Sequence, residues 1–134
     1  MSKTSFSGPV RGSYICIPVL AGGVVLAGTH VYDAAIPTGM KVYLFGATYG
    51  CSVSTGGSFI LGTTADDNGY LTTTTFVSLT STYKAFDGAL GNVEVDDADD
   101  LNAIITVGTT LTNAYISLWG YVTAHTSSLT AAGL

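Results

Sequence analysis

The chain has 134 residues, of which 47% are hydrophobic and 10% are charged, and its four basic and nine acidic residues give a net charge of −5. This length suits one domain with a single core, and the scarcity of basic residues argues against a nucleic-acid-binding surface. The 17 glycines, the many threonines, valines and tyrosines, and the single glutamate favour β structure over helix. A mean hydropathy of +0.45 implies a largely uncharged outer surface, which is easier to tolerate in a subunit of an oligomer or assembly.

The two ends of the chain are expected to lie outside the folded domain. Residues 1–12 are rich in serine and glycine, and their apolar anchors are Phe6 and Val10, so they predict an N-terminal arm that is extended or disordered unless something holds it. Residues 13–125 are expected to form one β domain. Residues 126–134 predict a loose C-terminal tail.

The first strands are predicted on either side of a glycine pair. Residues 14–20 and 24–32 are β-prone runs, and the glycines at positions 22–23 between them predict a turn. Pro18 has no backbone N–H to donate to a neighbouring strand. The first strand is therefore expected at a sheet edge or with a bulge.

The uncharged stretch at residues 12–32 is long enough to be considered for a membrane span or a signal peptide. Pro18, His30 and three glycines interrupt it, so neither is predicted. Cys16 and Cys51 lack the spacing of a metal site. They could form one disulfide, but we interpret them as free, buried thiols.

The middle of the chain predicts a turn, a buried strand and a reversal. Residues 33–39 hold a proline and a glycine in a turn, and residues 40–49 are apolar at nearly every position, as in a central strand covered on both faces. A loop at residues 52–57 and a short strand at residues 59–61 are expected next. Residues 66–69, Asp-Asp-Asn-Gly, then predict a reversal, because Asn, Asp and Gly tolerate left-handed backbone.

The second half of the chain predicts further strands and an acidic turn. Residues 70–79 indicate a half-exposed strand, whereas residues 80–90 lack clear periodicity and predict a loop with aromatic residues. Residues 91–100 contain five of the nine acidic residues, which predicts a solvated turn or a single helical turn. Residues 103–107 and 114–124 are expected to end the fold as a hairpin.

The last predicted strand alternates cleanly between two faces. The face assigned to the core consists of Ala114, Ile116, Leu118, Gly120 and Val122. The other face consists of Tyr115, Ser117, Trp119, Tyr121 and Thr123. Tyrosine and tryptophan bury well against a partner, so the second face is a candidate interface. The alternative is that a second sheet of the same domain covers it.

The sequence contains no evident catalytic or cofactor-binding motif. His30 and His125 lie in no recognisable nucleophile motif, and His30 is interpreted as a half-buried strand side chain; phosphate-binding, zinc and dinucleotide motifs are also missing. The aspartates at residues 66–67 lie in a predicted turn without an evident aromatic cleft for glycoside hydrolysis. Candidate calcium ligands are Asp96, Asp97, Asp99 and Asp100, although solvated turns are the preferred interpretation. We therefore expect neither an enzyme nor a cofactor or metal.

Three motifs resemble those of a phage protein family. Residues 5–10, Ser-Phe-Ser-Gly-Pro-Val, are similar to the start of many small proteins encoded near the major capsid protein in tailed bacteriophages. Ile-Pro-Thr-Gly-Met-Lys-Val at residues 36–42 and Leu-Gly-Thr-Thr-Ala-Asp-Asp-Asn-Gly-Tyr-Leu at residues 61–71 follow in a similar order. Over residues 6–123, the chain resembles the capsid decoration, or cement, proteins.

This resemblance implies an all-β fold: a single antiparallel β-sandwich, jelly-roll-like, with an extended N-terminal arm. It implies a structural virion protein that binds the outer surface of the major capsid protein shell, often as a homotrimer, and stabilises it. Such a protein is assembled in the host cytoplasm and needs neither nucleic acid nor membrane as a partner. The residues expected to contact neighbouring subunits are Phe6, Pro9, Val10, Arg11, Tyr115, Trp119 and Tyr121.

Two other functions remain open at this point. A carbohydrate-binding or adhesion module would use exposed aromatic residues of a β-sandwich to stack on sugars. Another virion structural subunit, from the tail or a head fibre, would share the composition of a decoration protein.

Overall fold

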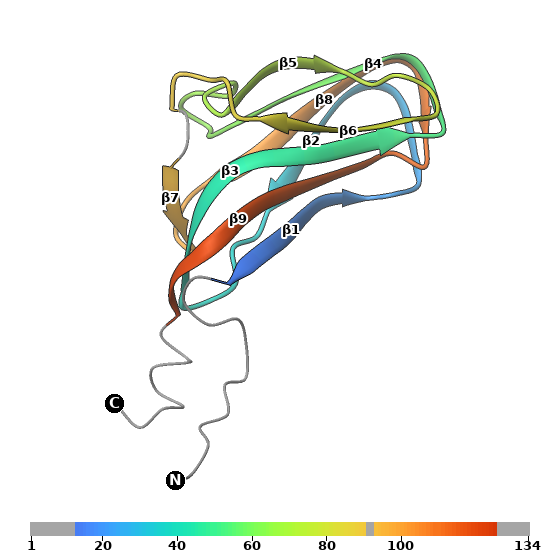
Figure 1. Ribbon diagram of the computed structural model, residues 1–134. Helices are drawn as coiled ribbons and strands as arrows, with labels where there is room; N and C mark the ends of the chain where they lie inside the picture. The colour runs from blue at the N-terminus through green and yellow to red at the C-terminus, as the bar shows by residue number, and fades with distance from the viewer. Residues whose placement is uncertain (1–12, 91–92, 126–134) are drawn as a thin grey trace, which may run out of the picture.

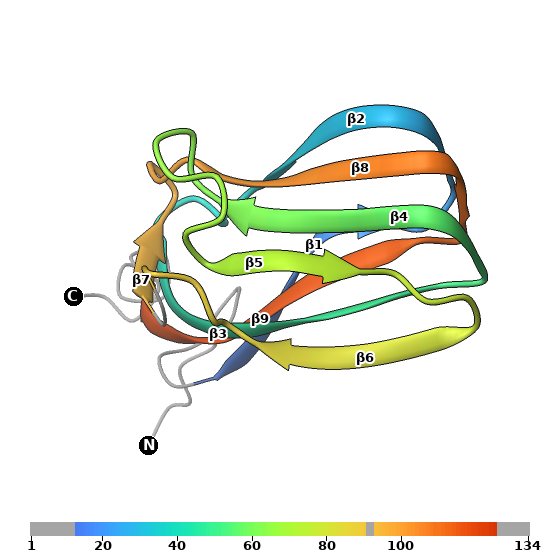
Figure 2. The same cartoon turned by 90° about the horizontal axis from the view of Figure 1, so that it is seen from above.

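A computed structural model of the protein describes residues 13–90 and 93–125. Within these residues the fold is all β, and nine strands form two antiparallel sheets that pack against each other (Figures 1 and 2). This confirms the predicted antiparallel β-sandwich. The predicted arm at residues 1–12 and the predicted tail at residues 126–134 lie outside the described residues.

We call the two layers the front sheet and the back sheet, as they appear in Figure 1. The front sheet contains, in spatial order, β1 (Tyr14–Ala21), β9 (Tyr115–His125), β3 (Met40–Cys51) and β6 (Thr80–Ala85), and β7 (Val93–Asp96) also pairs with β3. The back sheet contains, in spatial order, β2 (Val24–Ala34), β8 (Leu101–Thr112), β4 (Val53–Gly62) and β5 (Leu71–Thr75).

The core lies between the sheets and follows from the alternation of the central strands. On β9, every second residue from Ile116 to Val122 points inward, as predicted for this strand. The largest fully buried side chains are Phe59, Met40, Leu44, Leu61, Leu71, Leu101, Ile105, Leu111, Ile116, Leu118, Val42 and Val95. Each sheet therefore contributes one continuous apolar face.

The first connection confirms the role predicted for its glycines. Gly22 and Gly23 have φ angles of 110° and 109°, which only glycine adopts readily. The chain there crosses from β1 in the front sheet to β2 in the back sheet. Pro18 lies on the edge strand β1, next to a register shift, so it is at both an edge and an irregularity.

The predicted C-terminal hairpin is wrong. β8 pairs with β2 and β4, whereas β9 pairs with β1 and β3, so the two strands lie in different sheets. Asn113, with a φ of 50°, turns the chain across the sandwich. Each strand has one aliphatic face, and placing the strands in opposite layers turns both faces towards the same core.

The predicted loop at residues 52–57 is wrong, and the strand expected at residues 59–61 is much longer. β4 runs through both segments, with a register shift between Thr55 and Gly57 against β8. Gly56 has a φ of 71°, so the glycine pair marks a bulge inside the strand. Gly57 packs so closely against Leu111 that a larger residue would collide with its side chain.

The strand predicted at residues 70–79 ends early, and the loop predicted at residues 80–90 contains β6. The physical reason is Phe76, which is buried and has its ring 5.3 Å from Phe59 and 5.9 Å from Tyr49. To place this ring in the core, the chain leaves the back sheet. It then turns at Leu79, where φ is 58°, and enters the front sheet.

The reversal at residues 66–69 is confirmed, because β4 and β5 are antiparallel neighbours. Its conformation differs from the one predicted: neither Asn68 nor Gly69 has a positive φ. Hydrogen bonds shape the loop instead. The N–H groups of Thr63 and Gly69 both donate to the carbonyl oxygen of Asp66, at 2.9 and 3.1 Å.

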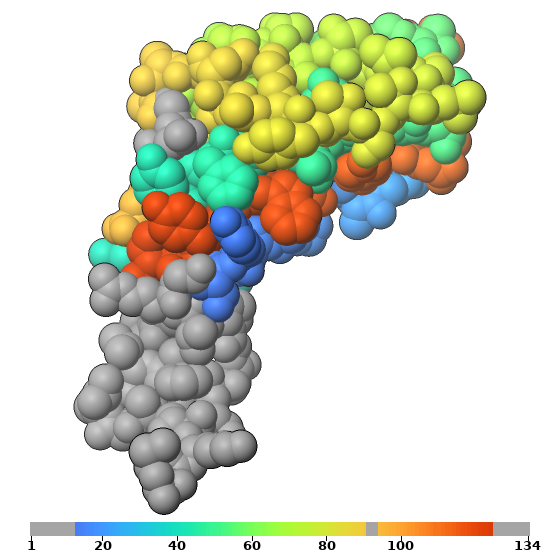
Figure 3. All heavy atoms as spheres, in the orientation of Figure 1, coloured from blue at the N-terminus to red at the C-terminus, as the bar shows by residue number. Residues whose placement is uncertain are grey.

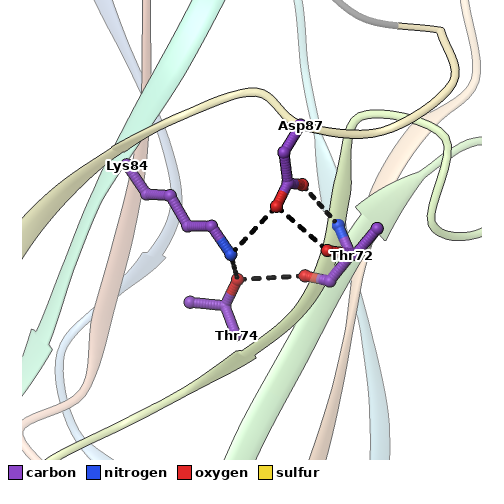
Figure 4. A network of polar contacts seen from close by, with 4 residues as sticks. All are labelled: Thr72, Thr74, Lys84 and Asp87. Atoms are coloured by element: carbon purple, nitrogen blue, oxygen red, sulfur yellow. Dashed lines mark hydrogen bonds and ion pairs between the residues drawn. The ribbon is translucent and has the colours of Figure 1, made fainter.

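A polar network joins the two sheets where β5 and β6 lie side by side (Figure 4). The Lys84 ammonium lies 3.2 Å from the Asp87 carboxylate and donates to Thr74 Oγ1 at 3.1 Å. Asp87 also accepts hydrogen bonds from the N–H and hydroxyl of Thr72, at 2.9 and 3.0 Å. This network links the edge strands of the front and back sheets.

Candidate binding face

The outer face of the front sheet carries a continuous group of aromatic side chains, which we call the aromatic face. Its members are Tyr14, Tyr43, Phe45, Tyr83, Tyr115, Trp119 and Tyr121, from β1, β3, β6 and β9. They are half of the 14 aromatic residues of the chain, counted as eight Tyr, five Phe and one Trp. Figure 3 views this face, with rings from β3, β6 and β9 side by side.

Strand register brings three of these tyrosines into one row. Tyr14 on β1 pairs with Tyr121 on β9, which in turn pairs with Tyr43 on β3. Residues paired across a sheet share a face, and the rings of Tyr43 and Tyr121 stack with centroids 5.2 Å apart. Three consecutive strands thus present one row of rings.

A register shift adds Phe45 to the row. The pairing of β3 with β9 shifts between Leu44 and Gly46, and Phe45 lies at this shift. Its ring centroid is 6.3 Å from that of Tyr14, edge to face, and 6.5 Å from that of Tyr83. Such pairs stabilise each other beyond their buried area, so the rings support one another.

Two glycines on the central strand allow neighbouring rings to lie close to the sheet. A side chain at Gly46 would collide with the Tyr83 ring, and one at Gly50 would collide with the Tyr115 ring. The rings therefore occupy the space that a Cβ atom would fill. The Tyr83 and Tyr115 rings can therefore pack directly against the backbone of β3.

Hydrogen bonds fix the orientation of two further rings. Trp119 Nε1 donates to Thr48 Oγ1 at 2.9 Å, and the Tyr115 hydroxyl is hydrogen-bonded to Ser81 Oγ. The first contact joins β9 to its neighbour β3, and the second reaches across β3 from β9 to β6. These two rings would therefore have little side-chain entropy left to lose when a partner binds.

The aromatic face is accessible, which excludes the alternative that the second sheet covers it. Tyr14 is 77% exposed and Tyr83 50% exposed, and the back sheet packs on the opposite, inner side. The prediction that residues 40–49 are covered on both faces is wrong for the same reason. Tyr43 and Phe45 are only half-buried, because neighbouring rings of the same face shield them and no second layer lies over them.

Sequence reasoning found part of this face. The structure brings Tyr115, Trp119 and Tyr121 together as predicted, whereas Phe6, Pro9, Val10 and Arg11 lie outside the described residues. The rings of β1, β3 and β6 were missed. On β3, buried residues alternate with the outward-facing Tyr43, and this alternation is the signal for the face. It is hard to see in the sequence, because nearly every residue of the segment is apolar.

The acidic residues near β7 bind neighbouring loops. Asp97 accepts the N–H of Gly39 at 3.0 Å, and Asp100 accepts the N–H and hydroxyl of Thr64. The hydrogen bond from the Thr64 side chain lowers the pKa of Asp100 below its ordinary value. In the part of the chain that the structure describes, no three His, Cys, Asp or Glu residues lie together as metal ligands.

The histidine and cysteine side chains considered in the sequence analysis lie on three different strands: Cys16 on β1, His30 on β2 and Cys51 on β3. His30 is half-buried, as predicted, with Nε2 2.9 Å from the Leu26 carbonyl oxygen. Cys16 and Cys51 are free, as expected, but only Cys51 is buried, and desolvation raises the pKa of its thiol. Over residues 13–90 and 93–125, no helix is long and apolar enough to cross a membrane.

Comparison with known proteins identified no relative of this chain. No protein-family model matches the chain, and neither the curated proteins nor the solved structures gave a match. The aromatic face and the sequence motifs are therefore the basis for a functional argument.

Proposed function

We propose that the protein is a structural virion protein, a capsid decoration or cement protein of a tailed bacteriophage, which binds the outer surface of the major capsid protein shell and stabilises it. The observation that carries this proposal is the aromatic face, an accessible group of seven rings on one side of a small sandwich. The three motifs at residues 5–10, 36–42 and 61–71 resemble those of capsid decoration proteins, and this resemblance suggests that the partner is a capsid.

The aromatic face suits a protein partner. Tyrosine and tryptophan are enriched at the buried centres of protein interfaces, where the ring is desolvated and the polar atom keeps a hydrogen bond. Charges are few here: Lys41, Glu94 and Asp96 lie at the β7 side of the face. A partner therefore desolvates little charge when it covers the rings.

Stabilisation of the shell follows from mass action. A protein that binds a site present only in the assembled shell adds its binding free energy to the assembled state and not to free subunits. No chemical step is required of the protein. Its effect on the capsid depends on affinity and on how many capsid subunits each copy touches.

Further parts of the proposal rest on the sequence alone. We propose that the protein acts as a homotrimer on the capsid surface after assembly in the host cytoplasm, without nucleic acid or membrane as a partner. Residues 1–12 would add contacts through Phe6, Pro9, Val10 and Arg11.

We also propose that the sandwich is a jelly roll. The strand orders β1-β9-β3-β6 and β2-β8-β4-β5 support this. The connections β1–β2, β3–β4, β5–β6 and β8–β9 each cross between the sheets, as successive strands do in a double-sheet roll.

The proposal is tested by replacing the two most exposed rings, in a Tyr14→Ser and Tyr83→Ser double variant. Binding to undecorated capsids of the phage that encodes the chain is measured by co-sedimentation. We expect affinity to fall at least about tenfold, since large rings dominate the binding energy of interfaces. Val31→Ser, which replaces an exposed aliphatic residue on the back sheet, should bind normally. Unchanged binding by the double variant would contradict the proposal.

A second candidate, a carbohydrate-binding or adhesion module, is favoured by one observation. The exposed rings of Tyr14 and Tyr83 and the stacked pair Tyr43–Tyr121 present π surfaces on which a sugar could stack. Glycan binding by the isolated protein, abolished by Trp119→Ala, would support it. Electron microscopy of purified particles would separate both functions from a tail or head-fibre subunit.

A further inference from the structure

We propose that copies of this chain associate with one another through one end of the sandwich, which we call the apolar tip. It is defined by four exposed aliphatic side chains, Val24, Val53, Val77 and Leu79. The tip lies apart from the aromatic face. The inference rests on the homotrimer proposed above, for which it supplies the contact surface, but not on what the aromatic face binds.

The four side chains belong to one region of the fold. Val24 on β2 and Val53 on β4 both pair with Thr112 on β8, so the three residues form a row across the end of the back sheet. In Figure 2 the connections β1–β2, β3–β4, β5–β6 and β8–β9 gather at this end, on the right.

Hydrogen bonds hold the β5–β6 loop beside this row. Ser78 Oγ accepts the N–H of Ser54 at 2.9 Å and donates to its carbonyl oxygen at 3.3 Å. The N–H of Leu79 donates to the carbonyl oxygens of Cys51 and Ser52, at 3.1 and 3.2 Å. The residues on both sides of Val53 are thus tied to the loop that carries Val77 and Leu79.

Leu79 is the most unusual residue of the tip. It is 87% exposed, and its φ of 58° is a left-handed conformation that a leucine rarely adopts. Glycine or asparagine would fit this backbone better and would expose no apolar surface. The isolated chain gains nothing from this side chain, whereas a partner that buries it would.

Charge is segregated away from the tip. The acidic residues are Asp33, Asp66, Asp67, Asp87, Glu94, Asp96, Asp97, Asp99 and Asp100. They lie at the end of β2, in the β4–β5 loop, after β6, and on or after β7, all towards the opposite end of the sandwich from the tip (Figure 2). Within the described residues, the four connections at the tip carry no charged side chain.

A second copy is the occupant that fits this arrangement. Each chain has a net charge of −5, so copies repel unless their acidic ends stay apart, and contact through the tips keeps them apart. A charged partner would find nothing at the tip to pair with, whereas another copy offers the same uncharged, apolar surface. Closed symmetry about the tip then gives a discrete oligomer.

The test is sedimentation of the full chain without capsids, over a range of concentrations. The unaltered chain should form a discrete oligomer. Val77→Asp and, separately, Leu79→Gly should each weaken association at least about tenfold, since truncating a buried anchor commonly has such an effect. Leu79→Gly suits the left-handed backbone, so its loss of association cannot come from misfolding.

The matched control is Val31→Asp. Val31 is 60% exposed on β2, but its partner Ile104 places it towards the other end of the strand from Val24. It should associate like the unaltered chain. A chain that is monomeric at every concentration, association that survives both tip variants, or equal loss in Val31→Asp would each overturn the inference. Capsid binding is measured separately, so failure of the proposed function has its own readout.

Discussion

Two glycines of the front sheet have different neighbours. Substitution of one should mainly affect the stability of the fold, and substitution of the other should mainly affect binding. Gly120 on β9 is buried, and a Cβ atom there would collide with the backbone oxygen of Tyr43. Gly46 is buried as well, but the three atoms nearest to a Cβ atom there all belong to the side chain of Tyr83, which is half exposed and can swing into solvent. The backbone oxygen of Tyr43 beside Gly120 cannot move aside in this way.

Gly120→Ala should therefore lower the free energy of unfolding by about 2–3 kcal/mol, as overpacking in a core does. Gly46→Ala should cost less than Gly120→Ala, because the half-exposed Tyr83 ring can move aside, but it should weaken the proposed capsid binding by displacing Tyr83. Urea denaturation of both variants measures the first effect. Equal destabilisation by the two would show that the Tyr83 ring is not free to move.

At the scale of elements, the polar network between β5 and β6 makes stability depend on pH. Burial raises the pKa of Asp87, but hydrogen bonds from Thr72 and Lys84 outweigh this effect, so the pKa lies below its ordinary value. The stabilisation is therefore complete above the unfolded-state pKa of about 3.9, and is lost as pH falls through the lower, folded-state pKa.

Asp87→Asn should cost about 1 kcal/mol at pH 7, because the group is partly exposed and loses only part of its hydrogen bonding. The difference from the unaltered protein should shrink as the pH is lowered below about 4, where the carboxylate of the unaltered chain becomes protonated. Urea denaturation at several pH values measures it. A difference that stays constant with pH would refute the assigned role of the carboxylate.

The elements also show what the sequence could predict. The β1 edge strand, the crossing glycines 22–23 and the two faces of β9 follow from local chemistry, because Pro18 and strict alternation act within a few residues. The assignment of β8 and β9 to different sheets, and the entry of Phe76 into the core, depend on distant strands. Periodicity carries no information about such long-range pairing.

The candidate binding face was likewise predictable only where alternation along a single strand indicates it. Alternation on β9 indicated Tyr115, Trp119 and Tyr121, but Tyr14 and Tyr83 join them only through the register of the front sheet. The apolar tip was not predictable, since its members come from two strands and one loop that are far apart in sequence. Leu79 gave no signal, because a leucine does not indicate a left-handed turn.

At the scale of the whole molecule, the sandwich divides its surface into three parts: an aromatic face, an apolar tip and an end with the acidic loops. We assign the first part to the capsid and the second to other copies. The two surfaces are distinct, so one oligomer could use both at once, which would multiply the contacts that each bound oligomer makes with the shell.

The most direct test of the proposed function is a cryo-electron microscopy map of virus particles purified from the source of this chain, at a resolution that distinguishes the two sheets. The account predicts that the outer face of the front sheet, with Tyr14, Tyr83 and Trp119, lies against the major capsid protein. A map in which this chain is absent from the capsid surface, or in which these rings face solvent, would contradict it.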